Sequence, residues 1–142
     1  LDRLKDSIVN GGPDAFIMRC GTARAYKQLI RAAGGNTAVM MQLPNFGKPV
    51  LTHDGVPILI NDYIPGDVDQ GSATDTCSIY AVRLNMADGL HGIYGGPSAG
   101  VQVEDIGTVQ NMDSTRTRLK WYTGLALKST KSLAAIVGIT NV

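Results

Sequence analysis

The segment that decides the fold is Val101 to Ile139, which reads VQVEDIGTVQ at 101–110, STRTRLKWYTGLALK at 114–128 and SLAAIVGI at 132–139. In the middle stretch, one set of alternate positions is mostly apolar and the other begins with cations: Leu119, Trp121, Thr123, Leu125 and Leu127, against Arg116, Arg118 and Lys120. Because strand side chains alternate between faces, this period of two predicts a long strand with an apolar row on one face. No catalytic group stands out among these strands, which favours a structural or assembly role.

Length and composition set the class of protein. The chain has 142 residues, 44% of them hydrophobic and 18% charged, which predicts one globular domain, or one domain with an appendage. The formal net charge of +1 argues against a chain that binds nucleic acid through its overall charge. No apolar run is long enough to span a bilayer, and the first residues do not resemble a signal peptide. Cys20 and Cys77 are the two cysteines, for which buried free thiols are favoured over a disulfide.

Helical spacing appears twice near the start of the chain. Leu1, Leu4 and Ile8 recur at helical intervals from the first residue, and this uncapped beginning suggests the C-terminal portion of a longer protein. A second helix is expected after Thr22 as its N-cap, with an apolar stripe through Tyr26 and the pair Gly34-Gly35 closing it; the rest of the stripe is Leu29, Ile30 and Ala33.

The remainder alternates between strand and turn patterns. Short strands are expected at 15–18, 39–43, 50–52, 56–60 and 78–84. The Asp-Gly step in His53-Asp54-Gly55 predicts a hairpin between the third and fourth of them. Two stretches, 66–76 and 88–100, are rich in turn residues and are expected to be exposed loops. The fold class is therefore α+β, with helices first and strands dominating the rest.

Several motifs suggest chemistry but lack an essential residue. Asp67-x-Asp69-x-Gly71 begins like a calcium loop, yet Ser78 stands where the closing glutamate belongs. His53 and His91 have no partner at zinc-site spacing. The glycine-rich stretch 95–100 lacks the lysine of a phosphate loop. We therefore expect no metal site, no cofactor and no enzymatic activity.

One enzymatic alternative remains, at Gly96-Pro97-Ser98-Ala99-Gly100. This stretch resembles the nucleophile motif of Lon-type Ser-Lys proteases, with Ser98 as nucleophile. Gly95 stands where that family usually carries an acidic residue, and the chain continues into a strand rather than a helix. The bases that this reading would require are Lys120, Lys128 or Lys131.

The order of the pieces carries a broader resemblance. It runs from Phe16-Ile17-Met18 through the helix after Thr22, Gly47-Lys48-Pro49-Val50 and the long strand around Trp121 to Ala134-Ala135-Ile136-Val137. This order resembles the C-terminal half of tailed-bacteriophage major capsid proteins of the HK97 fold. Residues 1–100 then resemble the axial domain, and residues 101–142 the terminal strands of the peripheral domain. The family's N-terminal arm, extended loop and spine helix would precede Leu1.

The resemblance implies a structural capsid protein that assembles into an icosahedral shell around double-stranded DNA. Its partners would be copies of itself in pentamers and hexamers, with scaffold, portal and decoration proteins, and it would be located in the virion after assembly in the host cytoplasm. Encapsulin nanocompartments share this fold, so a cellular shell is an alternative. No membrane partner is expected.

Candidate residues for subunit interfaces or for the lumen follow from this reading. They are Arg116, Arg118, Lys120 and Tyr122 on the long strand, and Asp67 and Asp69 in the first expected loop. Trp121 is expected to pack inside against the sheet. The stretches 66–76 and 88–96 are candidates for loops that contact partners, and the alternative is that they only connect the strands. A solvated strand face is the alternative for the cations.

Overall fold

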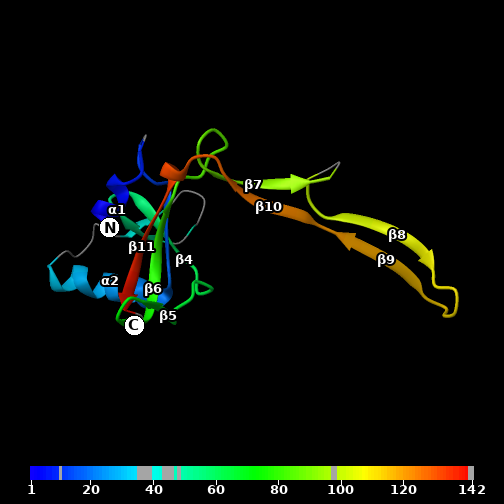
Figure 1. The fold of residues 1–142 in the computed structure, drawn as a ribbon, viewed down its shortest axis with the longest axis horizontal. Helices are drawn as coiled ribbons and strands as arrows, with labels where there is room; N and C mark the ends of the chain where they lie inside the picture. The colour runs from blue at the N-terminus through cyan, green and yellow to red at the C-terminus, as the bar shows by residue number, and fades with distance from the viewer. Residues whose placement is uncertain (10, 35–39, 43–46, 48, 97–98, 141–142) are drawn as a thin grey trace. The chain divides into compact units, whose positions relative to one another are not determined.

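A computed structural model describes residues 1–9, 11–34, 40–42, 47, 49–96 and 99–140, and Figure 1 shows its elements. The helices are α1 (Asp2–Asp6), α2 (Cys20–Ala32) and the short 3-10 helix η1 (Thr130–Ser132). The strands are β1 (Ala15–Met18), β2 (Met40–Gln42), β3 (Pro49–His53), β4 (Val56–Ile60), β5 (Val68–Gln70), β6 (Ala73–Val82), β7 (Leu90–Gly95), β8 (Gln102–Thr108), β9 (Thr115–Lys120), β10 (Tyr122–Leu127) and β11 (Leu133–Thr140).

The chain divides into two compact units. The first comprises residues 1–90 and 127–142, and the second comprises residues 91–126. β11, which the sequence grouped with the terminal strands, belongs to the sheet of the first unit. The assignment of 1–100 and 101–142 to axial and peripheral domains stays a prediction.

A mixed seven-stranded sheet forms the first unit, within the part of the chain that the structure describes. Its order is β11-β6-β1-β4-β3-β2, with β5 paired to β6. β1 runs parallel to β4, with Phe16 opposite Ile58, and antiparallel to β6, with Phe16 opposite Ala81. The expected hairpin at His53-Asp54-Gly55 is confirmed, because β3 and β4 pair with His53 opposite Val56. Both Asp54 and Gly55 have the positive φ that such a two-residue turn requires.

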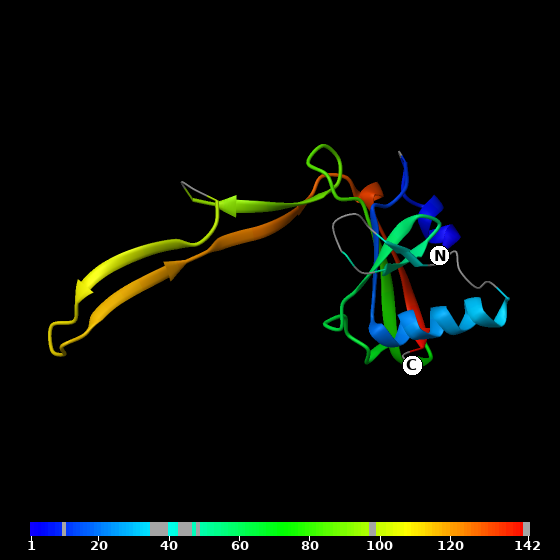
Figure 2. The same ribbon diagram turned by 180° about the vertical axis from the view of Figure 1, so that it is seen from behind.

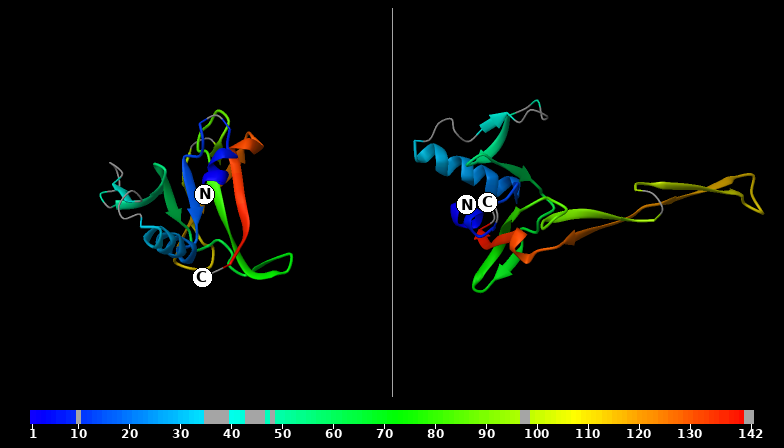
Figure 3. Two further views of the ribbon diagram at one scale, coloured as in Figure 1. Left: turned by 90° about the vertical axis from the view of Figure 1, so that its left-hand side faces the viewer. Right: turned by 90° about the horizontal axis from the view of Figure 1, so that it is seen from above.

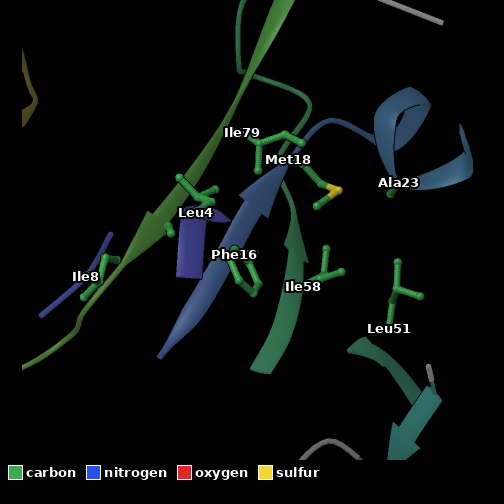
Figure 4. Packing of buried hydrophobic residues seen from close by; sticks show 9 residues of the cluster. Leu4, Ile8, Phe16, Met18, Ala23, Leu51, Ile58 and Ile79 are labelled. Carbon is green, nitrogen blue, oxygen red and sulfur yellow. The ribbon is translucent and has the colours of Figure 1, made fainter. Parts of the chain in front are cut away.

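Both helices pack on one face of this sheet and form the core (Figure 4). Phe16 and Met18 point to this face from alternate positions of β1 and are fully buried. Leu4 from α1, Ala23 from α2 and Ile58 from β4 belong to the same buried cluster. Figure 2 shows α2 crossing the strands of the sheet rather than running along them.

The start of α2 differs from the prediction. Its N-cap is Arg19, without a side-chain hydrogen bond, and Thr22 lies inside the helix. The Thr22 hydroxyl is buried, 3.1 Å from the Cys77 sulfur, so it does not cap the helix. Instead the Asp62 carboxylate accepts a hydrogen bond from the Cys20 amide at 3.0 Å. This bond lowers the pKa of Asp62. Cys20 is exposed, Cys77 is buried and both are free thiols.

Two expected loops are strands instead. The stretch 66–76 contains β5 and the beginning of β6, which pair through Val68 opposite Thr76. The stretch 88–96 contains β7. Both were misjudged because Asp, Gly, Ser and Thr suit turns by composition, whereas here backbone hydrogen bonds to a neighbouring strand outweigh that preference.

Candidate functional site

The second unit is a long two-stranded ribbon, in which β7 pairs with β10 and β8 with β9 (Figure 3). In the second pair, Val103 lies opposite Leu119, and Glu104 lies opposite Arg118. The sequence predicted one strand over 114–128, and the structure divides it at Trp121 into β9 and β10. A β-bulge between Asp105 and Gly107 shifts the register toward the tip.

One face of the β8–β9 pair carries interacting charges. The Lys120 ammonium donates a hydrogen bond to Glu104 Oε1 at 2.5 Å, and Arg118 Nη1 lies 3.9 Å from Glu104 Oε2. The hydrogen bond from Lys120, together with the nearby Arg118 charge, lowers the pKa of Glu104. Two of the three predicted cations therefore bind one carboxylate within the ribbon. These side-chain contacts support the same β8–β9 register as the backbone pairing does.

Arg116 differs from the other two cations. It is exposed, and no ion pair of the described residues includes it. It lines a shallow hollow over the bulge, together with Gly107 and Asn111. Of the predicted cationic row, Arg116 is thus the residue whose charge is available to another molecule.

Apolar side chains of the ribbon are left in solvent. Leu119, Trp121 and Leu125, which we call the apolar row, are 69%, 61% and 75% exposed. The expectation that Trp121 packs inside is wrong for this chain, because a two-stranded ribbon has no second layer to cover either of its faces. Tyr122 is also exposed. On the β7–β10 pair, Ile93 fills the space beside Gly124, where an added Cβ would lie 3.3 Å from Ile93.

The two predicted aspartates lie in the first unit. Asp67 lines a groove with Asp62, Tyr63 and Asp75, and Asp69 is exposed on β5. Ser98, the nucleophile of the hydrolase alternative, lies outside the described residues. No group of metal-ligating side chains occurs within residues 1–9, 11–34, 49–96 and 99–140. Of the helices that the structure describes, none combines the length and apolarity needed to cross a bilayer.

Sequence reasoning missed one network in the first unit. His53, expected as a turn or surface residue, lies with Nε2 2.6 Å from Asp2 Oδ1 and Nδ1 2.6 Å from the Tyr26 hydroxyl. Its ring also meets Phe16 edge-on. Burial, together with the Asp2 charge, raises the pKa of Tyr26. The network ties α1 and α2 to the β3–β4 hairpin, and the separation of its members in sequence left no local signal.

The chain has an α+β fold of the HK97-like class. Among solved structures, the chain is similar to the cryo-EM structure of the holo-SrpI encapsulin complex from Synechococcus elongatus PCC 7942, with a TM-score of 0.76 and 22% sequence identity. The similarity covers 99% of this chain and 49% of that one, so the chain spans about half the length of this neighbour. No protein-family model and no curated protein matches the sequence.

Proposed function

We propose that this protein is a subunit of a self-assembling, HK97-fold shell. The observation that carries the proposal is the apolar row, which a lone subunit exposes to water. Removing apolar surface from water contributes about 25 cal/mol per Å², so large apolar side chains exposed close together in one segment favour an interface there. Copies of the same chain are the partner that the fold favours, since a closed shell requires each subunit to present several modest contacts to its neighbours.

Two forms of shell fit this role. The order of sequence motifs supports a bacteriophage major capsid protein in the virion, which would enclose double-stranded DNA and meet scaffold, portal and decoration proteins. The structural similarity to an encapsulin complex supports a cellular shell instead. In either form the role is structural and not enzymatic. Purified particles distinguish the two, because a viral shell yields encapsidated genomic DNA whereas a cellular shell yields protein cargo.

The apolar row provides the test of assembly. Uniform closed shells are expected for the wild-type protein by electron microscopy. The double variant Leu119→Thr/Leu125→Thr is expected to keep its far-UV circular dichroism spectrum but to sediment as small species, because its row no longer gains from burial. Met112→Thr is the matched control, since Met112 is 71% exposed near the ribbon tip but lies outside the row.

The outcomes separate the alternatives. Shells formed equally well by the double variant would contradict the role of the apolar row. A wild-type protein that stays monomeric at every concentration would contradict the shell function. Labelling of Ser98 by a serine-reactive probe, with loss of labelling in Ser98→Ala, would favour the Lon-like hydrolase instead.

A further inference from the structure

One side of α2 carries cations and no carboxylates: Arg24 and Arg31 are exposed, and Lys27 is half-buried. Arg24, Lys27 and Arg31, which we call the cationic stripe, are spaced three and four residues apart and therefore share one face of the helix. The sequence of α2 contains no Asp or Glu. In the described part of the chain, neither Lys27 nor Arg31 has an ion-pair partner. Lys27 and Arg31 are thus two cations of the stripe whose charge no ion pair of the described residues neutralises.

A groove of opposite charge lies elsewhere on the same unit. Its lining includes three aspartates and one cation, Arg19, and we call it the acidic groove; the aspartates are Asp62, Asp67 and Asp75, and Tyr63 lies among them. The Asp62 carboxylate already accepts a hydrogen bond from the Cys20 amide. Asp67 and Asp75 have no ion-pair partner among the described residues. Tyr63 is 96% exposed, which is unusual for a large aromatic side chain.

Within one chain, Lys27 and Arg31 lie away from the acidic groove. The bond between Asp62 and Cys20 fixes the groove beside the first turn of α2. Lys27 and Arg31 lie seven and eleven residues further along a straight helix, about 10 and 16 Å away along its axis. Figure 2 shows the helix running from this point to the outer edge of the unit. The dipole of α2 explains a carboxylate at Asp62, but it does not explain the exposed Tyr63 or the two unpaired aspartates.

We propose that the cationic stripe of one copy of this chain docks in the acidic groove of the next copy. Two complementary surfaces at different places on one rigid unit make a head-to-tail contact, which closes into a ring when the rotation between copies allows it. Tyr63 is the central anchor, because an aromatic ring binds an Arg or Lys cation through its face and excludes water from the surrounding ion pairs. This inference rests on the proposed shell function and names one contact that would build it.

Charge reversal on each side, alone and together, tests the contact. Lys27→Glu/Arg31→Glu and Asp67→Lys/Asp75→Lys are each expected to raise the protein concentration needed for assembly at least about tenfold, through repulsion across the contact. Combining all four substitutions restores opposite charges and is expected to return that concentration to within about threefold of the wild-type value. Lys128→Glu/Lys131→Glu is the matched control for Lys27→Glu/Arg31→Glu, with the same change in net charge on exposed positions of the same unit.

A measurement on the unmodified protein avoids reliance on variants that fold poorly. Zero-length carbodiimide cross-linking of assembled wild-type particles is expected to join Lys27 to Asp67 or Asp75 of another copy. Mixing isotope-labelled and unlabelled protein identifies such links as intermolecular by mass spectrometry.

The possible results distinguish the pairing of the two surfaces from the shell function. Wild-type particles without these cross-links, or reversal variants that assemble like the control, would overturn the pairing and leave the shell function intact. Failure of the combined variant to assemble, where each reversal alone is also impaired, would likewise overturn it. A wild-type protein that never assembles would overturn the pairing together with the shell function.

Discussion

At the scale of single residues, the turn that follows β6 is held by one side chain. Asn85 Oδ1 accepts hydrogen bonds from the amides of Ala87, Asp88 and Gly89 at 2.8–2.9 Å. The Leu90 amide then returns to the Arg83 carbonyl at 2.8 Å. These bonds wind residues 85–89 into a compact loop and direct the chain from the sheet into β7.

Gly89 is the residue of this loop that cannot be replaced by a larger one without a clash. A Cβ at position 89 would lie 2.6 Å from both the Arg83 carbonyl oxygen and the Asn85 amide nitrogen. Gly89→Ala is therefore expected to lower the free energy of unfolding by about 1–3 kcal/mol, as overpacking against backbone does. Urea titration followed by circular dichroism measures this change.

Gly92 is the matched control for that substitution. Nothing lies within 4 Å of a Cβ built there, and its φ is not in the left-handed region. Gly92→Ala is expected to leave the unfolding midpoint unchanged. Equal midpoints for the two variants would show that the loop relaxes around the added methyl group.

At the scale of elements, the cations of β9 have different roles. Lys120 and Arg118 hold Glu104, so reversing either would weaken the ribbon itself. Arg116→Glu leaves these ion pairs intact, because Arg116 has no such partner in the described chain. The variant is expected to weaken assembly by up to about 1 kcal/mol for each contact, the usual range for an exposed ion pair.

Light scattering against protein concentration at low salt measures the effect of Arg116→Glu. Lys131→Glu is the control, since it removes an exposed cation from η1 rather than from the ribbon. The effect should disappear at 0.5 M salt, where the screening length falls to about 4 Å. Assembly of Arg116→Glu that matches the control at low salt would assign Arg116 to a solvated strand face.

Elements with local signals were predictable from the sequence. The β3–β4 hairpin followed from the Asp54-Gly55 step, and α2 followed from its helical spacing. The strand β5 was not predictable, since its identity depends on pairing with β6 and its own residues suit a loop. The exposure of Trp121 was also missed, because alternation shows that a strand has an apolar face but not whether another layer covers it.

At the scale of the whole molecule, the core belongs to one unit. The buried cluster around Phe16 contains no residue of 91–126. The Lys128 amide lies 3.5 Å from the Gly89 carbonyl oxygen, so the two ends of the ribbon leave the first unit side by side. The first unit therefore has the core and the chain geometry to fold without the ribbon.

Replacing residues 91–126 with Gly-Ser-Gly tests this independence. The shortened chain is expected to unfold cooperatively, with a smaller urea m-value because less surface is exposed on unfolding. It is also expected to lose assembly, since the apolar row is gone. A control that replaces only residues 110–113 should still assemble. A shortened chain without cooperative unfolding would show that the sheet requires the ribbon.

The pairing of β11 with β6 has a consequence for folding kinetics. Leu133 lies opposite Val82, so this edge of the sheet forms only when positions about 50 residues apart in sequence meet, and closing so long a loop costs conformational entropy. The turn at the ribbon tip, 109–114, is local and is closed by a hydrogen bond from the Val109 amide to the Ser114 carbonyl. We therefore expect that a ribbon formed early shortens the effective loop between β6 and β11. When the ribbon has paired from its tip to Leu90 and Leu127, only short segments of chain separate β6 from β11. Slow nucleation at the ribbon tip would thus delay completion of a sheet that the tip never touches.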